Sequence, residues 1–246
     1  MIKSQMNNHL GDKVSRQEQI VNMFDSIANK YDLVNRILTF GIDKKWREKA
    51  VRETLEVINK KEVKILDVAC GTGDMIEIWQ KEAAKKAIKT KICGLDPSRG
   101  MLEVAKKRFP SVKFYNAYAT SIPCYDDSID GISISFGIRN VLEIRKAIKE
   151  FYRVLKKDGI VLVLEFVKAK NPNKFRKCVD FYSNKFLPKI GGILSKNKEA
   201  YEYLPNSIEN FYTPNELINL FNEQGFETVK IDSFNFGQVG VFIFKK

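Results

Sequence analysis

A short apolar run, Val63–Ala69, leads into the glycine turn Cys70–Gly73 and then into a helical segment from Asp74 to about Lys86. A strand followed at once by a helix is typical of a parallel sheet, in which each helix packs back on its strand. Glycines let the chain turn sharply and let a ligand approach the backbone closely. The free N–H groups that begin the helix favour polar ligands. This unit therefore predicts an α/β domain with a ligand site at the turn.

The same alternation continues along the chain. Helical segments end near Arg108 and extend over Val141–Leu155, between runs that have the composition of buried strands. Strands alternating with helices predict a doubly wound, mostly parallel, Rossmann-like sheet. The last two runs are joined by a short connection and predict an antiparallel pair, for seven strands in all. The predicted strands after the first are Lys91–Asp96, Val112–Tyr115, Gly131–Phe136, Ile160–Phe166, Glu227–Ile231 and Val239–Phe244.

The segments that flank this core divide the chain into further regions. The pattern is helical on both sides of a break at Gly41, and Thr213–Glu216 has the residues of a helix-capping box with proline at the first helical position. An aromatic-rich stretch is too long for a plain connection and predicts a lid or substrate wall. We expect a flexible tail (1–13), an N-terminal helical cap (14–60), a ligand-binding core (61–169), a lid insertion (170–212) and a C-terminal helix with the strand pair (213–246).

Composition excludes several classes of site. The only histidine is His9, so catalytic triads and histidine metal sites are excluded, and a general base must be a carboxylate, tyrosine, lysine or bound water. The four cysteines are widely spaced with no CxxC pair, which favours reduced thiols, and we expect no metal. No apolar run approaches the roughly 18 residues of a membrane span, and the first residues do not resemble a secretory signal. We expect a cytoplasmic protein.

The formal net charge of +12 has two interpretations. It could mark a basic face for nucleic acid or for an anionic membrane. It could also be a compositional bias, because lysine far outnumbers arginine. Nucleic-acid sites favour arginine for its planar guanidinium. We therefore favour the compositional explanation.

Two acidic residues indicate what the glycine turn binds. Asp67 lies inside the end of an apolar strand, and Asp96 ends the next strand, where doubly wound sheets place an acid that binds ribose hydroxyls. A dinucleotide fingerprint would need a third glycine where this chain has Ile76. The pattern disfavours a pyrophosphate and favours an adenosine ligand without phosphates, such as S-adenosylmethionine. The alternative is a tight turn that binds no ligand.

Several segments together resemble a known family. They are similar to class I S-adenosylmethionine-dependent methyltransferases and, more narrowly, to the ubiquinone/menaquinone biosynthesis C-methyltransferases. The cofactor motif is shared by many methyltransferases, whereas the first and fourth segments are particular to the quinone branch. The segments are MFDSIANKYDLVNRILTFGIDKKWR (23–47), DVACGTGD (67–74), GLDPSRGMLEVAKKR (94–108), SISFGIRNV (133–141) and FYRVLKKDGIVLVLEF (151–166).

The resemblance implies a set of cofactor-binding residues. Asp96 would bind the ribose, Ser135 would lie beside the methionine moiety, and Thr72 would contribute through its backbone and hydroxyl. This chain departs from its relatives in two places: Tyr118 replaces an asparagine or aspartate, and Cys124 replaces a phenylalanine. The full set implied or indicated for the cofactor is Asp67, Gly71, Thr72, Gly73, Asp96, Tyr118, Ala119 and Ser135.

A second set would serve catalysis. Arg139 and Asn140 follow the fourth predicted strand, where it opens onto the crevice. Arg139 stays protonated and would stabilise an ionised quinol, while Asn140 would orient the quinol oxygen or a water. A carboxylate, Asp25 or Asp32, would accept the proton. An ion pair with a neighbouring carboxylate is the alternative for Arg139. The resemblance further implies that the segment with Asp25, Tyr31, Asp32 and Asn35 closes over the cofactor. We also expect Trp46 and the aromatic residues of the insertion to line an apolar channel. The alternative for each of these aromatics is that it packs in the core.

The implied substrate is a demethylated polyprenyl quinol. Its ionised ring would take a methyl group at carbon and then lose the ring proton. We favour demethylmenaquinol, with the corresponding benzoquinol of ubiquinone biosynthesis as the alternative. A nucleic-acid methyltransferase is less favoured, since amino-methylating members have an Asn/Asp-Pro-Pro-aromatic motif that is absent here; a non-catalytic binding protein is a third interpretation. We expect peripheral contact with the inner face of the membrane and no nucleic-acid partner, and a homodimer stays open.

Overall fold

The computed structural model describes residues 16–28, 41–168, 203 and 206–246. At its centre is a seven-stranded sheet in the order β3-β2-β1-β4-β5-β7-β6, with β1 to β5 parallel and β7 antiparallel to both β5 and β6. The strands are β1 (Glu62–Val68), β2 (Lys89–Asp96), β3 (Lys113–Asn116), β4 (Ile129–Ser135), β5 (Leu155–Phe166), β6 (Glu227–Phe234) and β7 (Val239–Lys245).

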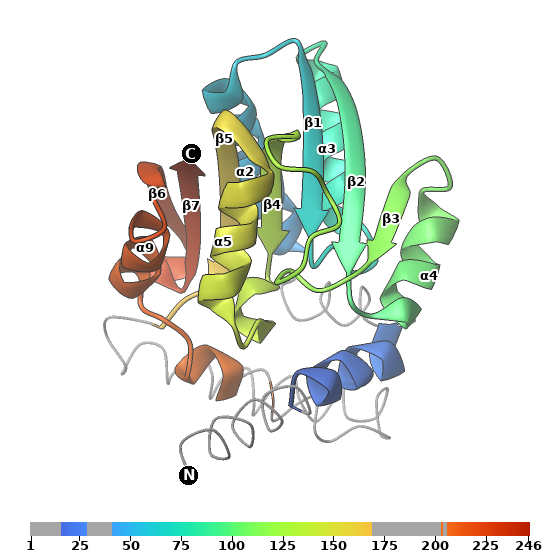
Figure 1. Cartoon of the computed structure of the whole chain (residues 1–246), viewed down its shortest axis with the longest axis vertical. Helices are drawn as coiled ribbons and strands as arrows, with labels where there is room; N and C mark the ends of the chain where they lie inside the picture. Colours follow the sequence, from blue (N-terminus) through green and yellow to red (C-terminus); the bar gives the residue numbers. More distant parts are fainter. Residues whose placement is uncertain (1–15, 29–40, 169–202, 204–205) are drawn as a thin grey trace.

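Helices cover both faces of this sheet (Figure 1). α5 (Ile144–Val154) and α9 (Pro214–Asn222) pack on one face, whereas α2 (Ile42–Ile58) and α3 (Asp74–Lys85) pack on the other. α4 (Arg99–Arg108) follows β2 near the β3 edge. Right-handed crossovers between parallel strands produce this doubly wound arrangement. The predicted α/β class, the seven strands and the antiparallel terminal pair are confirmed.

Alternation along the central strands divides the core into two layers. In β5, Val161 and Val163 face the layer with α5 and α9, whereas Leu162 and Leu164 face the layer with α2 and α3. All four side chains are fully buried. A strand covered on both faces is mostly apolar at both alternating sets of positions, which explains the continuous apolar run over residues 160–164.

Two elements begin at residues other than those expected from the sequence. β5 begins at Leu155, and its pairing with β4 shifts register between Ile129 and Gly131. The expected helix over Val141–Leu155 begins only at Ile144, because a 3-10 turn, η1 (Ile138–Asn140), precedes it.

The helix start predicted near Thr213 is confirmed. The Thr213 hydroxyl accepts a hydrogen bond from the Glu216 amide, and the Glu216 carboxylate accepts one from the Thr213 amide. Pro214 occupies the first helical position, where its missing N–H costs no hydrogen bond.

Only part of the regions that flank the core is described. Residues 16–28 and Ile42–Ile58 are helical, within the expected cap. The expected tail and residues 169–202 of the expected insertion lie outside the described residues. No described helix has the length and apolar character needed to cross a membrane.

Candidate functional site

A cavity of about 280 Å³ opens at the carboxyl ends of β1, β2 and β4. The strand order reverses between β1 and β4, and ligands of open α/β sheets bind at such a switch point. Helix 16–28 lies below these strand ends in Figure 1 and supplies one wall. Sequence-predicted residues that line the cavity are Asp67, Gly71, Thr72, Asp96, Tyr118, Ala119, Ser135 and Asn140.

The glycine turn forms one side of the cavity. Gly71 and Gly73 both adopt left-handed backbone angles, with φ of 54° and 97°. A Cβ at Gly71 would meet no described atom within 4 Å, whereas one at Gly73 would lie 2.6 Å from the Phe109 ring. Gly73 is therefore required for packing. Gly71 leaves space on the cavity side that a ligand can occupy.

Asp96 connects the turn to α4. Its Oδ2 accepts a hydrogen bond from the Gly71 amide and its Oδ1 accepts one from the Ser98 amide, both at 2.8 Å. Burial raises the pKa of the carboxyl to about 6, against the two amide bonds, which favour the charged form. Each oxygen keeps a second lone pair for a ligand hydroxyl.

Asp67 lies at the floor of the cavity. Its Oδ1 accepts a hydrogen bond from the Ser133 hydroxyl at 2.7 Å, and that hydroxyl accepts one from the Trp79 indole at 2.9 Å. Burial raises the pKa of Asp67 to about 7, partly offset by the Ser133 bond and the charge of Arg47. These bonds hold Oδ1 of Asp67 in place, and Oδ2 takes no part in them.

Two buried oxygen atoms of the lining accept no hydrogen bond from the described residues. Asp67 Oδ2 and Ser135 Oγ have no partner among the described residues. An unsatisfied buried acceptor costs free energy, and a ligand that donates hydrogen bonds would recover it. Both atoms therefore indicate a donor-rich ligand, such as one with an ammonium group.

The remaining cofactor candidates also lie at the cavity. Thr72 is buried, and its carbonyl oxygen and hydroxyl accept hydrogen bonds from Arg108. Ala119 is buried, whereas Tyr118 is 39% exposed. Burial and the charge of Glu18 raise the pKa of the Tyr118 phenol. Tyr118 is thus placed at the rim, and Ala119 inside it.

Phe136 turns the chain out of β4, which ends at Ser135. It adopts a left-handed conformation with φ of 54°, although it is not a glycine. Gly137 follows, and a Cβ there would lie 2.5 Å from the Ala69 side chain, so the loops after β1 and β4 touch at this point. A bulky residue in the left-handed region is a strained feature that is often found at functional sites.

Arg139 forms a buried ion pair. Its Nη1 donates to Glu165 Oε1 at 2.6 Å and to the Phe136 carbonyl at 2.7 Å, and its amide donates to Glu165 Oε2 at 3.2 Å. Both side chains are buried, and Arg139 does not line the cavity in the part of the chain described. An ion pair with a neighbouring carboxylate, the alternative interpretation of Arg139, is present. The catalytic role of Arg139 stays a prediction.

Asn140 does line the cavity. Its Oδ1 accepts a hydrogen bond from the Tyr203 hydroxyl at 2.8 Å, and its carbonyl accepts one from the Gln17 side chain at 3.0 Å. Gln17 also accepts a bond from the Leu142 amide at 3.1 Å. Within the described ranges nothing accepts from Asn140 Nδ2, so these N–H groups can bind a ligand oxygen.

Helix 16–28 is bound at both sides of the cavity. Gln17 holds it to the loop after β4, and Asp25 holds it to the start of α4. Asp25 Oδ1 accepts hydrogen bonds from the Ser98 hydroxyl at 2.5 Å and from the Gly100 amide at 2.8 Å. Asp25 is not among the described lining residues, so its predicted role as a proton acceptor has no contact that supports it here.

Other predicted residues have different positions or lie beyond the description. Trp46 stacks on Phe234 at 5.7 Å between ring centroids, so it packs in the core on the α2 side and does not line the described cavity. Tyr31, Asp32 and Asn35 lie outside the described residues, as do most aromatics of the insertion. Cys70, Cys93 and Cys124 are free thiols.

Sequence reasoning missed two residues of the site, Arg47 and Glu165, whereas Tyr203 was among the aromatics of the insertion that were expected to line a channel. Both lie within segments that carry the family resemblance, 23–47 and 151–166, but their contacts depend on how elements distant in sequence pack together. Glu165 carried one available signal, an acidic residue within the apolar run of β5. The described part of the chain brings together no group of three acidic, cysteine or histidine side chains suited to a metal ion.

Comparison with known proteins identifies close relatives. The model of the ubiE/COQ5 methyltransferase family matches residues 12–246. A ubiquinone/menaquinone biosynthesis C-methyltransferase of Campylobacter jejuni is 52% identical, covering 95% of this chain and all of the relative. A demethylmenaquinone methyltransferase of Thermotoga maritima is 39% identical, covering 92% of this chain and 96% of the relative.

Solved structures support the fold. An S-adenosylmethionine-dependent methyltransferase from Thermotoga maritima superposes with a TM-score of 0.59 at 22% identity, covering 92% of this chain and 99% of that one. A second such protein, from Methanococcus maripaludis, gives a TM-score of 0.60 at 20% identity, covering 90% and 93%. At these identities the likeness shows the fold alone.

Proposed function

The chain belongs to the ubiE/COQ5 methyltransferase family, and we propose that it uses S-adenosylmethionine to methylate a ring carbon of a demethylated polyprenyl quinol, converting demethylmenaquinol to menaquinol. The observation that carries the proposal is the likeness to a demethylmenaquinone methyltransferase along nearly the whole of both chains. Transfer of a methyl group to that quinol by the purified protein tests it.

The cavity suits S-adenosylmethionine, which is a net cation with donor-rich ends. Asp96 would accept the ribose hydroxyls, Ala119 and Tyr118 would contact adenine, and the open space at Gly71 would admit the ligand to the backbone. Asp67 Oδ2 and Ser135 Oγ, both without described partners, would accept from the ammonium group. When bound, the cofactor supplies an electrophilic methyl group to the ring carbon of an ionised quinol, which then loses its ring proton.

The residues after β4 would favour the ionised quinol. Asn140 would donate from Nδ2 to the quinol oxygen, because Tyr203 already holds its Oδ1. Arg139, the neighbour of Asn140 in the chain, would act through its charge without contacting the quinol. A positive charge nearby lowers the pKa of the quinol hydroxyl and so favours its ionised form. Glu165 balances that charge, so the effect requires the guanidinium to be nearer the quinol than the carboxylate is.

The proton acceptor is proposed among the carboxylates of the cap, Asp25 or Asp32. Asp25 Oδ1 is occupied by Ser98 and Gly100, which suits holding the cap closed over the cofactor. A closed cap excludes water and aligns the methyl group with the ring carbon.

Cofactor affinity is expected to fall with pH below about 7. The folded protein raises the pKa of Asp67 to about 7 and that of Asp96 to about 6, in both cases by burial. At a pH below these pKa values the carboxyl groups are largely protonated and neutral. A neutral carboxyl does not attract a cation, so binding of S-adenosylmethionine then requires the release of a proton. S-adenosylmethionine should bind roughly tenfold more weakly at pH 6 than at pH 8, as measured by calorimetry.

The Asp67→Asn variant is the matched control for this pH dependence. It should bind more weakly at pH 8 and lose the step near pH 7, while the lower step from Asp96 persists. An affinity that stays constant from pH 5.5 to pH 8 in the unsubstituted protein would contradict the assignment.

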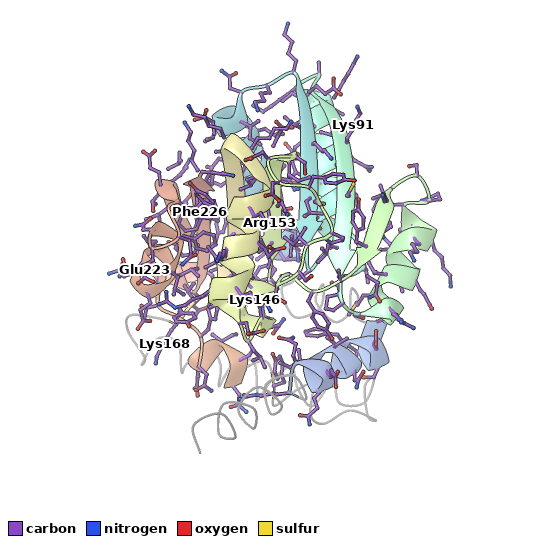
Figure 2. All side chains as sticks on the ribbon, in the orientation of Figure 1. Lys91, Lys146, Arg153, Lys168, Glu223 and Phe226 are labelled. Atoms are coloured by element: carbon purple, nitrogen blue, oxygen red, sulfur yellow. The ribbon has the colours of Figure 1, made fainter. Side chains whose placement is uncertain are left out.

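A polyprenyl substrate resides in the bilayer, and we propose that the edge of the sheet with the cavity contacts the membrane surface. Figure 2 shows Lys146, on α5, and Lys168, just beyond β5, toward this edge, and Lys91 toward the other end of the sheet. Lysines near an anionic surface contribute about 1 kcal/mol each.

Flotation with anionic liposomes at low salt tests this contact. The Lys146→Gln/Lys168→Gln variant should bind the liposomes on the order of tenfold more weakly than the unsubstituted protein. The Lys89→Gln/Lys91→Gln variant, with the same change of charge at the opposite end, should bind normally. Equal losses in both variants would show that only net charge matters.

A further inference from the structure

Arg47, on α2, is the one basic side chain among the described residues that line the cavity. It is only 6% exposed. A buried arginine is costly unless its charge meets anionic groups. The same lining contains five carboxylates, which are Glu18, Asp67, Asp74, Asp96 and Glu143. An adenosyl sulfonium with an amino-acid end is a net cation that also carries one carboxylate, so the single basic group in an acidic cavity matches the single anionic group of such a ligand.

Two contacts hold the guanidinium in place. Nη1 pairs with Asp43, one turn earlier on the same helix, and both partners are buried. The guanidinium carbon lies over the Phe136 ring, 5.1 Å from its centroid. Nε is also buried, and it has no hydrogen-bond partner among the described residues. The guanidinium of Arg47 is therefore held in place, and its Nε–H can still donate a hydrogen bond to a ligand.

Arg47 also lies close enough to Asp67 for its charge to stabilise that carboxylate. A cation and an anion that share one end of a cavity match the carboxylate and ammonium groups of an α-amino acid. Arginine binds carboxylates well because its planar N–H groups match their two oxygens. Phe136 in addition ties Arg47 to the turn that ends β4.

We infer that Arg47 binds the carboxylate of the methionine moiety of S-adenosylmethionine and so selects adenosyl sulfonium ligands with an intact amino-acid end. This inference rests on the proposed function, because it requires that the cavity bind this cofactor. The helix start at Gly73 offers backbone N–H groups as the competing partner for the carboxylate.

The test compares two ligands that differ by the carboxylate alone: S-adenosylmethionine and its decarboxylated analogue. Calorimetry should show that the unsubstituted protein prefers the former by about 10- to 100-fold, the range of a charge-assisted hydrogen bond. The Arg47→Met variant should lose this preference, mainly through weaker binding of S-adenosylmethionine. Binding is measured without quinol, so catalysis does not enter the result.

Three further variants keep the test decisive. Arg47→Met removes the positive charge that pairs with the buried Asp43 and can fail to fold, so Arg47→Met/Asp43→Asn removes both charges and should lose the preference equally. Asp43→Asn alone should keep it. Lys44→Met removes a basic residue of α2 that pairs with Glu77 outside the cavity, and it should also keep the preference.

The outcomes separate this inference from the proposed function. If the unsubstituted protein binds neither ligand, the proposed cofactor is wrong and the inference with it. If it binds S-adenosylmethionine but the double variant retains the preference, the cofactor stands and Arg47 is not the carboxylate ligand. Equal binding of both ligands by the unsubstituted protein would likewise overturn the inference alone.

Discussion

Asp96→Asn is expected to weaken S-adenosylmethionine binding by about 100-fold or more. In the proposed complex the Asp96 carboxylate accepts two ribose hydroxyls, and each such bond to a charged group contributes about 1.5–3 kcal/mol. The amide side chain can no longer accept from both the Gly71 and Ser98 amides, so the glycine turn loosens as well. Calorimetric titration of the purified variant measures the loss.

Asp130→Asn is the matched control. Asp130 is as buried as Asp96 and also accepts a backbone N–H, that of Lys64, but it lies at the start of β4 and pairs with Lys60 and Lys156. Its substitution should lower the melting temperature and leave cofactor affinity unchanged. If both variants lost affinity equally, the effect of Asp96 would be one of stability and the ribose assignment would fail.

Replacing Arg139 should produce the largest loss in turnover. Arg139→Met is expected to lower kcat by about 100- to 1000-fold, the range for removing a group that stabilises a developing oxyanion, with cofactor affinity intact. Single-turnover assays with saturating S-adenosylmethionine measure the change. The deficit should shrink at pH 9, because more of the quinol ionises without assistance.

The buried partner of Arg139 requires a second variant. Arg139→Met alone leaves Glu165 buried without its ion pair, which is strongly destabilising. Arg139→Met/Glu165→Gln removes both charges and should show the same loss in kcat and the same pH dependence. Near-normal turnover in the double variant, with the cofactor bound, would mean that the pair only maintains the turn after β4.

The fold was predictable because its determinants are local. The apolar run before Gly71, the capping box at Thr213 and the acid at the end of β2 are each read within a few residues. Asp67, Asp96 and Ser135 meet at one cavity because parallel strands place their carboxyl ends at the same edge. Element ends were less accurate, since η1 and the register shift in β5 depend on packing between strands.

The partners of the site residues were not predictable. Arg139 meets Glu165 across neighbouring strand ends, Asn140 meets Tyr203 from 63 residues away, and Arg47 enters the cavity from α2. No pattern within a few residues of the sequence predicts these contacts. They follow from the sheet order, which brings distant segments together at the switch point.

The contact of Asp25 illustrates the same limit. Its sequence context suggested a proton acceptor, whereas the structure places its Oδ1 against the start of α4. Gly100 makes this approach feasible, because a Cβ there would lie 3.2 Å from the Asp25 carboxylate. A residue that joins the cap to the core can affect cofactor retention without touching substrate.

The most direct test of the proposed function is an assay of the purified protein with methyl-labelled S-adenosylmethionine and two reduced substrates. These are demethylmenaquinol and the corresponding demethylated benzoquinol, each presented in anionic liposomes, with products identified by mass spectrometry. We expect one labelled methyl group on a ring carbon of demethylmenaquinol. Label on the benzoquinol alone would reassign the substrate, and no label on either quinol, with the cofactor bound, would contradict the proposed function.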